Sequence, residues 1–103
     1  MYKIIWEFSV PSDKIKSFEE SYGSNGEWAK LFSKHTGYKY TDLLMDKNHP
    51  GRYMTIDVWL TKEDFLNFKS TYKDAYNRLD AHCEGFTTAE NFIGEFESID
   101  EIS

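Results

Sequence analysis

Strand-like and helix-like segments follow one another along the 103 residues in the order β-α-β-β-α-β. The segments expected to be strands are rich in aromatic and branched apolar residues, and turn or capping residues bound them. They cover residues 2–10, 38–47, 52–60 and 88–97. The order is that of the split βαβ unit of ferredoxin-like folds. The sequence therefore predicts one α+β domain over residues 1–97, with helices on one face of a four-stranded antiparallel sheet, and an acidic tail over 98–103.

Short signals mark where helices and turns lie. Ser24–Glu27 matches the capping box S-x-x-E, so the first helical region is expected as two pieces bent at Gly23. Thr61 precedes acidic residues and is expected to cap one further helix, whose apolar stripe runs to Cys83. His49–Arg52 fits a type II turn, which predicts a hairpin between the second and third strands.

Each of the two strands 2–10 and 52–60 has one purely apolar face and one mixed face, because side chains along a strand point to opposite sides in turn. The mixed faces still carry large apolar side chains such as Ile5, Tyr53 and Trp59, a large area to leave in water. Helices can cover only one side of the sheet. We therefore expect a second copy of the chain to cover the other side, in a homodimer.

Composition narrows the possible partners. Acidic residues exceed basic ones by 18 to 12, so the net charge is −6, which argues against nucleic-acid binding and against attraction to an anionic membrane. No stretch approaches the roughly 20 apolar residues of a spanning helix. The single cysteine, Cys83, makes no intrachain disulfide, and the first ten residues lack the features of a signal peptide. We expect a cytoplasmic protein.

Two carboxylates in the middle of strands are the candidate catalytic groups. Asp57 and Glu7 both lie on mixed faces, and we expect them on the same side of the sheet, together with Trp59. Burial and a nearby like charge raise the pKa of a carboxyl group, so such a residue can accept a proton near neutral pH. The alternative is that these carboxylates form ion pairs with Arg52, Lys3 or a partner-chain base and fix the dimer.

Aromatic side chains are the candidate walls of a pocket of about 300 Å³ or more for a flat apolar ligand. The candidate ligand-binding residues are Tyr53, Trp6, Tyr40, Phe65, Phe68 and Tyr72. The last three also fit an ordinary core stripe of an amphipathic helix. No metal site is expected, because His82 and Cys83 would point about 100° apart on a helix and no second His-Cys pair exists. No cofactor-binding motif is present either.

The run Ile56–Phe65 resembles the strand-to-helix signature of the antibiotic biosynthesis monooxygenase-like superfamily, in which a Trp ends the third strand, a Ser or Thr caps the helix, and an acid and an aromatic follow. Phe8–Pro11 and Glu90–Phe96 also fit, so the resemblance covers nearly the whole chain. It implies a dimeric α/β barrel with a pocket between sheet and helices. Asp57 and Trp59 would then point toward the helices, and the purely apolar face would form the dimer.

The resemblance implies two kinds of chemistry. Some members oxygenate polycyclic phenols with O₂ and without metal or flavin, because the deprotonated substrate supplies the electrons. Others degrade haem with an Asn on the first strand, a Trp on the third and a His on the next helix. Trp59 matches that Trp, but Glu7 stands about where the Asn would be, and no His occurs between Phe65 and Asn77.

These observations favour a cofactor-independent monooxygenase that acts on or binds a small phenol- or quinol-type aromatic molecule. A non-catalytic barrel that binds such a molecule is the first alternative, and it predicts the same pocket without oxygen uptake. A purely structural dimer is the second, and it predicts that Asp57 is buried in ion pairs with no void beside it.

Overall fold

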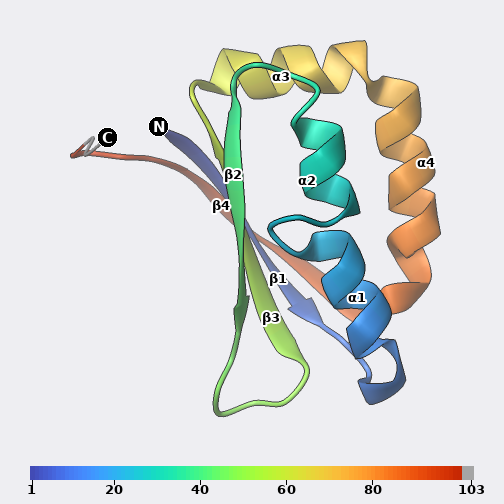
Figure 1. The fold of residues 1–103 in the computed structure, drawn as a ribbon. Coiled ribbons are helices and arrows are strands. Elements are labelled where there is room, and N and C mark those ends of the chain that lie inside the picture. Colours follow the sequence, from blue (N-terminus) through green and yellow to red (C-terminus); the bar gives the residue numbers. More distant parts are fainter. Residues whose placement is uncertain (101–103) are drawn as a thin grey trace.

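The computed structural model describes residues 1–100, and its elements follow the expected order (Figure 1). The strands are β1 (Tyr2–Ser9), β2 (Tyr38–Met45), β3 (Arg52–Trp59) and β4 (Ala89–Glu97). The helices are α1 (Ile15–Tyr22), α2 (Glu27–Phe32), α3 (Lys62–Thr71) and α4 (Lys73–Cys83), with 3-10 turns at Ser12–Lys14 and Glu84–Phe86. None of these helices is long and apolar enough to cross a membrane. The end of the expected acidic tail, residues 101–103, lies outside the described residues.

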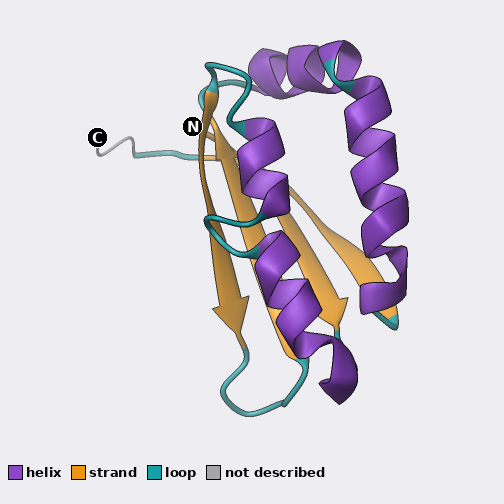
Figure 2. Cartoon of the chain, turned by 45° about the vertical axis from the view of Figure 1, so that its right-hand side comes forward, coloured by secondary structure: helices purple, strands orange, loops and turns teal. Residues whose placement is uncertain are grey.

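The four strands form one antiparallel sheet in the order β2-β3-β1-β4. The helices lie together on one side of this sheet, and no element of the described chain covers the other side (Figure 2). This confirms the α+β ferredoxin-like fold expected from the sequence.

The pairing of β1 with β3 decides which side chains face the helices. Ile4 lies opposite Asp57, and Glu7 lies opposite Met54. Trp59 is fully buried against aromatic rings of the helices, so Asp57, two residues earlier, faces the same way. This agrees with the placement that the family resemblance implied. The expectation that Glu7 shares this face is wrong, because the residue opposite it points away from the helices.

A cluster of rings fills the space between one end of the sheet and the helices. Trp59 is 0% exposed, and its ring centroid lies 5.2–5.4 Å from those of Phe32, Phe65 and Phe68. Aromatic pairs at such distances add to the stability that burial alone provides. Trp59 is therefore a central packing residue of the fold.

The first helical region is bent as expected, but its second piece begins differently. α2 has Gly26 as its N-cap, and no side chain caps it, so the capping box expected at Ser24 is wrong. A Cβ atom on Gly26 would lie only 2.6 Å from the carbonyl oxygen of Glu20 and 2.8 Å from that of Ser21. Close packing of the chain against the end of α1 therefore sets where α2 begins.

The second helical region is broken, where the sequence predicted one continuous helix. Thr61 caps α3 as expected, by accepting a hydrogen bond from the backbone N–H of Asp64. Tyr72 then leaves helical geometry at φ −109° and ψ 29°, and α4 runs in a new direction (Figure 1). The rings of Phe68 and Tyr72 stack 5.4 Å apart at this corner. The bend turns α4 back along the sheet, and this brings Tyr76 over the same ring cluster as Phe68.

The hairpin between β2 and β3 has the expected turn. Gly51 has φ +84°, and the backbone N–H of Arg52 donates to the carbonyl of His49 at 3.1 Å. A positive φ at this position is what a type II turn requires, and glycine adopts it without strain. The turn therefore explains the Pro50-Gly51 pair.

Candidate functional site

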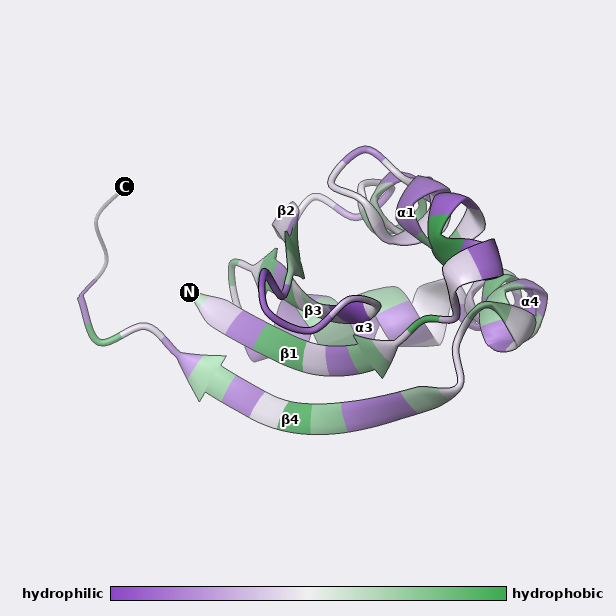
Figure 3. Ribbon diagram, turned by 90° about the horizontal axis from the view of Figure 1, so that it is seen from below, coloured by the Kyte–Doolittle hydropathy of each residue, from purple (hydrophilic) through white to green (hydrophobic). Residues whose placement is uncertain are grey.

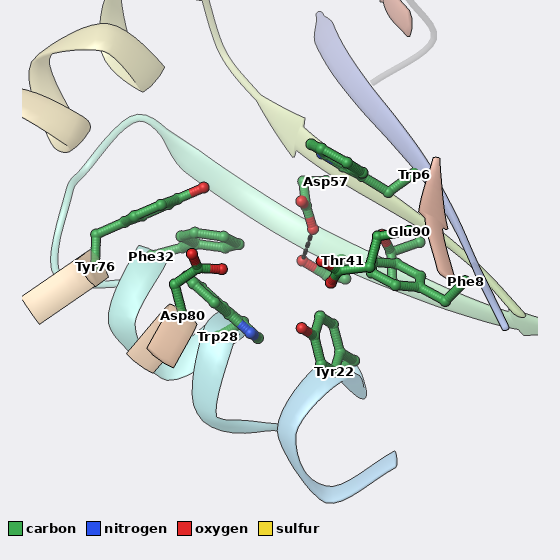
Figure 4. A pocket seen from close by; sticks show the side chains of 11 residues that line it. Trp6, Phe8, Tyr22, Trp28, Phe32, Thr41, Asp57, Tyr76, Asp80 and Glu90 are labelled. Atoms are coloured by element: carbon green, nitrogen blue, oxygen red, sulfur yellow. Dashed lines mark hydrogen bonds between the residues drawn. The ribbon is translucent and has the colours of Figure 1, made fainter. Parts of the chain in front are cut away.

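A cavity of about 260 Å³ lies between the sheet and the helices. Six aromatic rings from β1, α1, α2 and α4 form most of its wall (Figure 4). They belong to Trp6, Phe8, Tyr22, Trp28, Phe32 and Tyr76. A concave site with such walls and a few convergent polar groups is the usual form of a small-molecule site. Its volume lies just below the roughly 300 Å³ at which sites for drug-sized ligands begin, so it suits a compact, flat molecule.

Asp57, in β3, places a carboxyl group on the wall of this cavity. Its Oδ1 accepts a hydrogen bond from the Thr41 hydroxyl at 2.8 Å, and the Thr41 oxygen lies 2.8 Å from the Tyr38 hydroxyl. Because Thr41 has only one proton to donate, Tyr38 donates to Thr41, and Thr41 donates to Asp57. The pair of strands β2 and β3 thus holds the carboxylate in one orientation.

Burial changes the acidity of Asp57. Desolvation raises its pKa to about 6, while the hydrogen bond from Thr41 opposes the rise. No Lys, Arg or His side chain within residues 1–100 forms an ion pair with it. At neutral pH the group is therefore mainly an unpaired carboxylate, and it can accept a proton from a ligand in the cavity.

Two tyrosine hydroxyls in the wall of the cavity stay protonated. Burial raises the pKa of Tyr76 to about 12, with a smaller contribution from the charges of Asp80 and Asp57. Burial likewise raises the pKa of Tyr22 above its ordinary value. Both hydroxyls are therefore neutral at physiological pH and able to donate a hydrogen bond to a ligand oxygen.

The sequence itself matches no protein-family model and no curated protein. Solved structures match it over nearly its whole length. SnoaB, a cofactor-independent oxygenase from Streptomyces nogalater, is 17% identical in a mutant form, with 98% of this chain and 95% of that chain covered and a TM-score of 0.77. A candidate antibiotic biosynthesis monooxygenase from Nitrosomonas europaea is 21% identical, with 97% and 100% covered and a TM-score of 0.72. Rv0793 from Mycobacterium tuberculosis is 13% identical, with 99% and 98% covered and a TM-score of 0.72.

The chain has the same fold as these solved structures. Identities this low establish a common fold, and the chemistry has to be argued from the site, because one fold carries many activities. Within this fold the cavity lies between the sheet and the helices, where the resemblance placed it.

Two of the residues proposed from the sequence line this cavity, Asp57 and Trp6. Glu7 lies on the opposite side of the sheet, where it pairs with Arg52 and accepts a hydrogen bond from Asn91 at 3.2 Å. These contacts lower the pKa of Glu7, with the bond from Arg52 as the largest cause. The ion pair with Arg52 that was the alternative interpretation is thus present for Glu7 and absent for Asp57.

The remaining residues proposed from the sequence do not line the cavity: Trp59, Tyr53, Tyr40, Phe65, Phe68 and Tyr72. Trp59 is packed in the core with Phe65 and Phe68. Tyr53 is buried and donates its hydroxyl proton to Glu19 at 2.7 Å. Tyr40 lies opposite Val58, on the side away from the helices, and is about half-exposed.

Several residues that line the cavity were not among the candidate site residues predicted from the sequence. Trp28 and Phe32 are four residues apart on α2, and Tyr76 and Asp80 are four apart on α4, so each pair shares a helix face. That spacing was visible in the sequence. The helix break at Tyr72, which turns the face of α4 toward the cavity, was not.

Proposed function

We propose that this protein is a cofactor-independent monooxygenase that acts on a small phenol- or quinol-type aromatic molecule in the cavity beside Asp57. The observation that carries the proposal is an unpaired carboxylate with a pKa of about 6 in a cavity walled by aromatic rings. The rings hold a flat substrate, and the carboxylate takes its acidic proton. The likeness in fold to the cofactor-independent oxygenase SnoaB supports this chemistry.

The reaction balances without an added reductant. Asp57 removes a proton from the substrate, and the resulting anion transfers electrons to O₂ within the cavity. For a ring CH₂ group, one oxygen atom becomes the new carbonyl and the other leaves as water with both hydrogens of that CH₂. The substrate supplies all four electrons. The neutral hydroxyls of Tyr22 and Tyr76 stabilise the negative charge that grows on the substrate oxygen.

Oxygen uptake tests the proposal directly. With a panel of quinols and anthrone, at least one compound is expected to be consumed with one O₂ per molecule converted, faster with protein than without. The rate should rise with pH through about 6, because Asp57 accepts a proton only when ionised. An oxygen electrode and product analysis measure both. Tight binding of these compounds with no uptake at any pH would instead identify a non-catalytic binding protein.

We also propose that a second copy of the chain covers the open side of the sheet. That side carries large apolar side chains that are partly or about half exposed: Ile5, Tyr40, Leu44, Met54, Ile56 and Phe96. Hydrophobic bands interrupted by hydrophilic ones run along β1 and β4 (Figure 3). A sheet face of this kind packs stably against another sheet.

A substitution on this face is expected to break the dimer. Ile56→Lys places a charge in the middle of the open side without touching the cavity, because Ile56 points away from Asp57. Light scattering coupled to gel filtration should give twice the mass of one chain for the wild type and the mass of one chain for the variant. Leu66→Lys on α3, which is 50% exposed, is the matched control and should remain dimeric. A monomeric wild type would contradict the proposed dimer.

A further inference from the structure

The mouth of the cavity carries two more carboxylates. Asp80 comes from α4 and Glu90 from β4, and both are exposed at the rim. Neither forms a salt bridge or a hydrogen bond with another side chain in the part of the chain that the structure describes. Figure 4 shows both side chains, together with Asp57, directed toward the same space. The negative charge of Asp80 repels that of Glu90. This repulsion adds to the effect of burial in raising the pKa of Glu90.

No basic residue in the lining of the cavity offsets this charge. The residues that line the cavity include three carboxylates and no Lys, Arg or His. A ligand carboxylate or phosphate would face repulsion from all three and find no cation to pair with. A ligand ammonium group would be attracted by the carboxylates and by the faces of the surrounding rings, since the faces of aromatic rings are electrostatically negative.

A second, independent feature also points to a ligand. Trp28 is only 6% exposed, and its indole Nε1 is buried without a hydrogen bond of ordinary geometry among residues 1–100. Its neighbours on that side are the Tyr22 hydroxyl and the Cys83 thiol. Burial raises the pKa of both groups, and weak contacts with Trp28 oppose the rise. Figure 4 shows the Trp28 nitrogen at the end of the indole ring that faces Tyr22, where both side chains line the cavity. A buried donor with only such weak contacts is under-satisfied, so a ligand oxygen that accepts a well-aligned hydrogen bond from it would be favoured. The ligand thus carries a hydrogen-bond acceptor in addition to its cationic group.

We propose that the substrate is an aromatic molecule bearing a protonated amine, with its ammonium group between Asp80 and Glu90, an oxygen at the indole N–H of Trp28, and its acidic group at Asp57. The orientation of the acidic group rests on the proposed function. The preference for a cation does not, because it follows from the charges at the rim.

Three probes with the same two-ring skeleton separate charge from shape: 2-naphthylmethylamine, 2-naphthylmethanol and 2-naphthoate. Titration calorimetry at pH 7.5 and low salt is expected to show the ammonium probe binding about tenfold more tightly than the alcohol, with the carboxylate weakest. The double variant Asp80→Asn/Glu90→Gln should reduce the difference between amine and alcohol to about twofold. Both sites are exposed, so the variant is expected to fold, which circular dichroism checks.

A charge-matched control removes the same number of negative charges elsewhere. Asp13→Asn/Glu63→Gln changes two exposed carboxylates that do not line the cavity, and it should keep the full preference for the amine. Equal binding of the three probes, no binding of any, or an unchanged preference in the rim variant would overturn the inference. Oxygen uptake from a neutral quinol together with equal probe binding would leave the monooxygenase proposal standing alone. Amine preference without any oxygen uptake would support the cationic ligand and contradict the monooxygenase proposal.

Discussion

Asp57→Asn is expected to lower the rate of oxygen uptake by about 10²- to 10⁴-fold, because the variant loses its general base. The amide has the shape of the carboxyl group, and its oxygen can still accept the hydrogen bond that Thr41 donates at 2.8 Å. It cannot accept a proton at neutral pH. The measurement is kcat in an oxygen electrode, with a substrate that the wild type consumes.

Glu7→Gln is the matched control, because it removes a carboxylate from the opposite side of the same sheet. Its rate should stay close to that of the wild type. If Asp57→Asn retained the wild-type rate, Asp57 would not be the base, and the cavity would have to act through another group or only bind.

Asp57→Asn should also stabilise the fold at high pH. The pKa of Asp57 is raised from 3.8 to about 6 in the folded protein, so the folded state loses stability as pH rises from about 4 to about 6. Above that range, Asn in place of the ionised carboxylate is worth up to about 3 kcal/mol. Urea unfolding at one fixed protein concentration should therefore show a gain at pH 8 that vanishes at pH 3. A loss of stability at pH 8 would mean that burial of Asp57 is not costly.

Trp59→Ala should have the largest effect on stability, a loss of about 3–5 kcal/mol. The side chain is fully buried and contacts rings from β2, α2 and α3, including Tyr38, Phe32 and Phe68. Removing it leaves a hole that these rigid neighbours cannot fill. Thermal unfolding should shift downward by more than about 10 °C.

Trp59→Phe keeps most of the ring volume and should recover much of that loss. Trp6→Ala is the comparison at the cavity, since Trp6 is only partly buried and lines it; here ligand binding should fall more than stability. A Trp59→Ala protein that stays as stable as the wild type but loses activity would place Trp59 in the site instead of the core.

The order of the strands and helices could be predicted from local patterns. The side of the sheet on which Asp57 and Glu7 each lie could not. Alternation tells which residues of one strand point the same way, and it says nothing about which residue of the next strand lies opposite. In the protein Ile4 lies opposite Asp57, and this leaves Glu7 on the far side. A shift of one residue in this register would have made the original expectation correct.

The two carboxylates at the mouth of the cavity, Asp80 and Glu90, could not be predicted from the sequence for a similar reason. The register between β1 and β4 shifts between Ile5 and Trp6, so Glu95 and Glu90 both lie opposite helix-facing residues, although strict alternation would put them on opposite sides. Asp80 reaches the cavity because the chain turns at Tyr72. No proline or glycine at this position indicates a helix break in the sequence. Tertiary packing determines both irregularities, and a single sequence carries little signal of it.

The alternation of β3 has one more consequence, which concerns how such a protein can change over evolutionary time. Odd-numbered positions such as Thr55 and Asp57 line the cavity, whereas even-numbered ones such as Met54 and Ile56 lie on the open side of the sheet. Substitutions in one set leave the other set's surroundings largely untouched. Descendants of this chain are therefore free to change the lining of the cavity while keeping the open side of the sheet, or to change that open side while keeping the cavity.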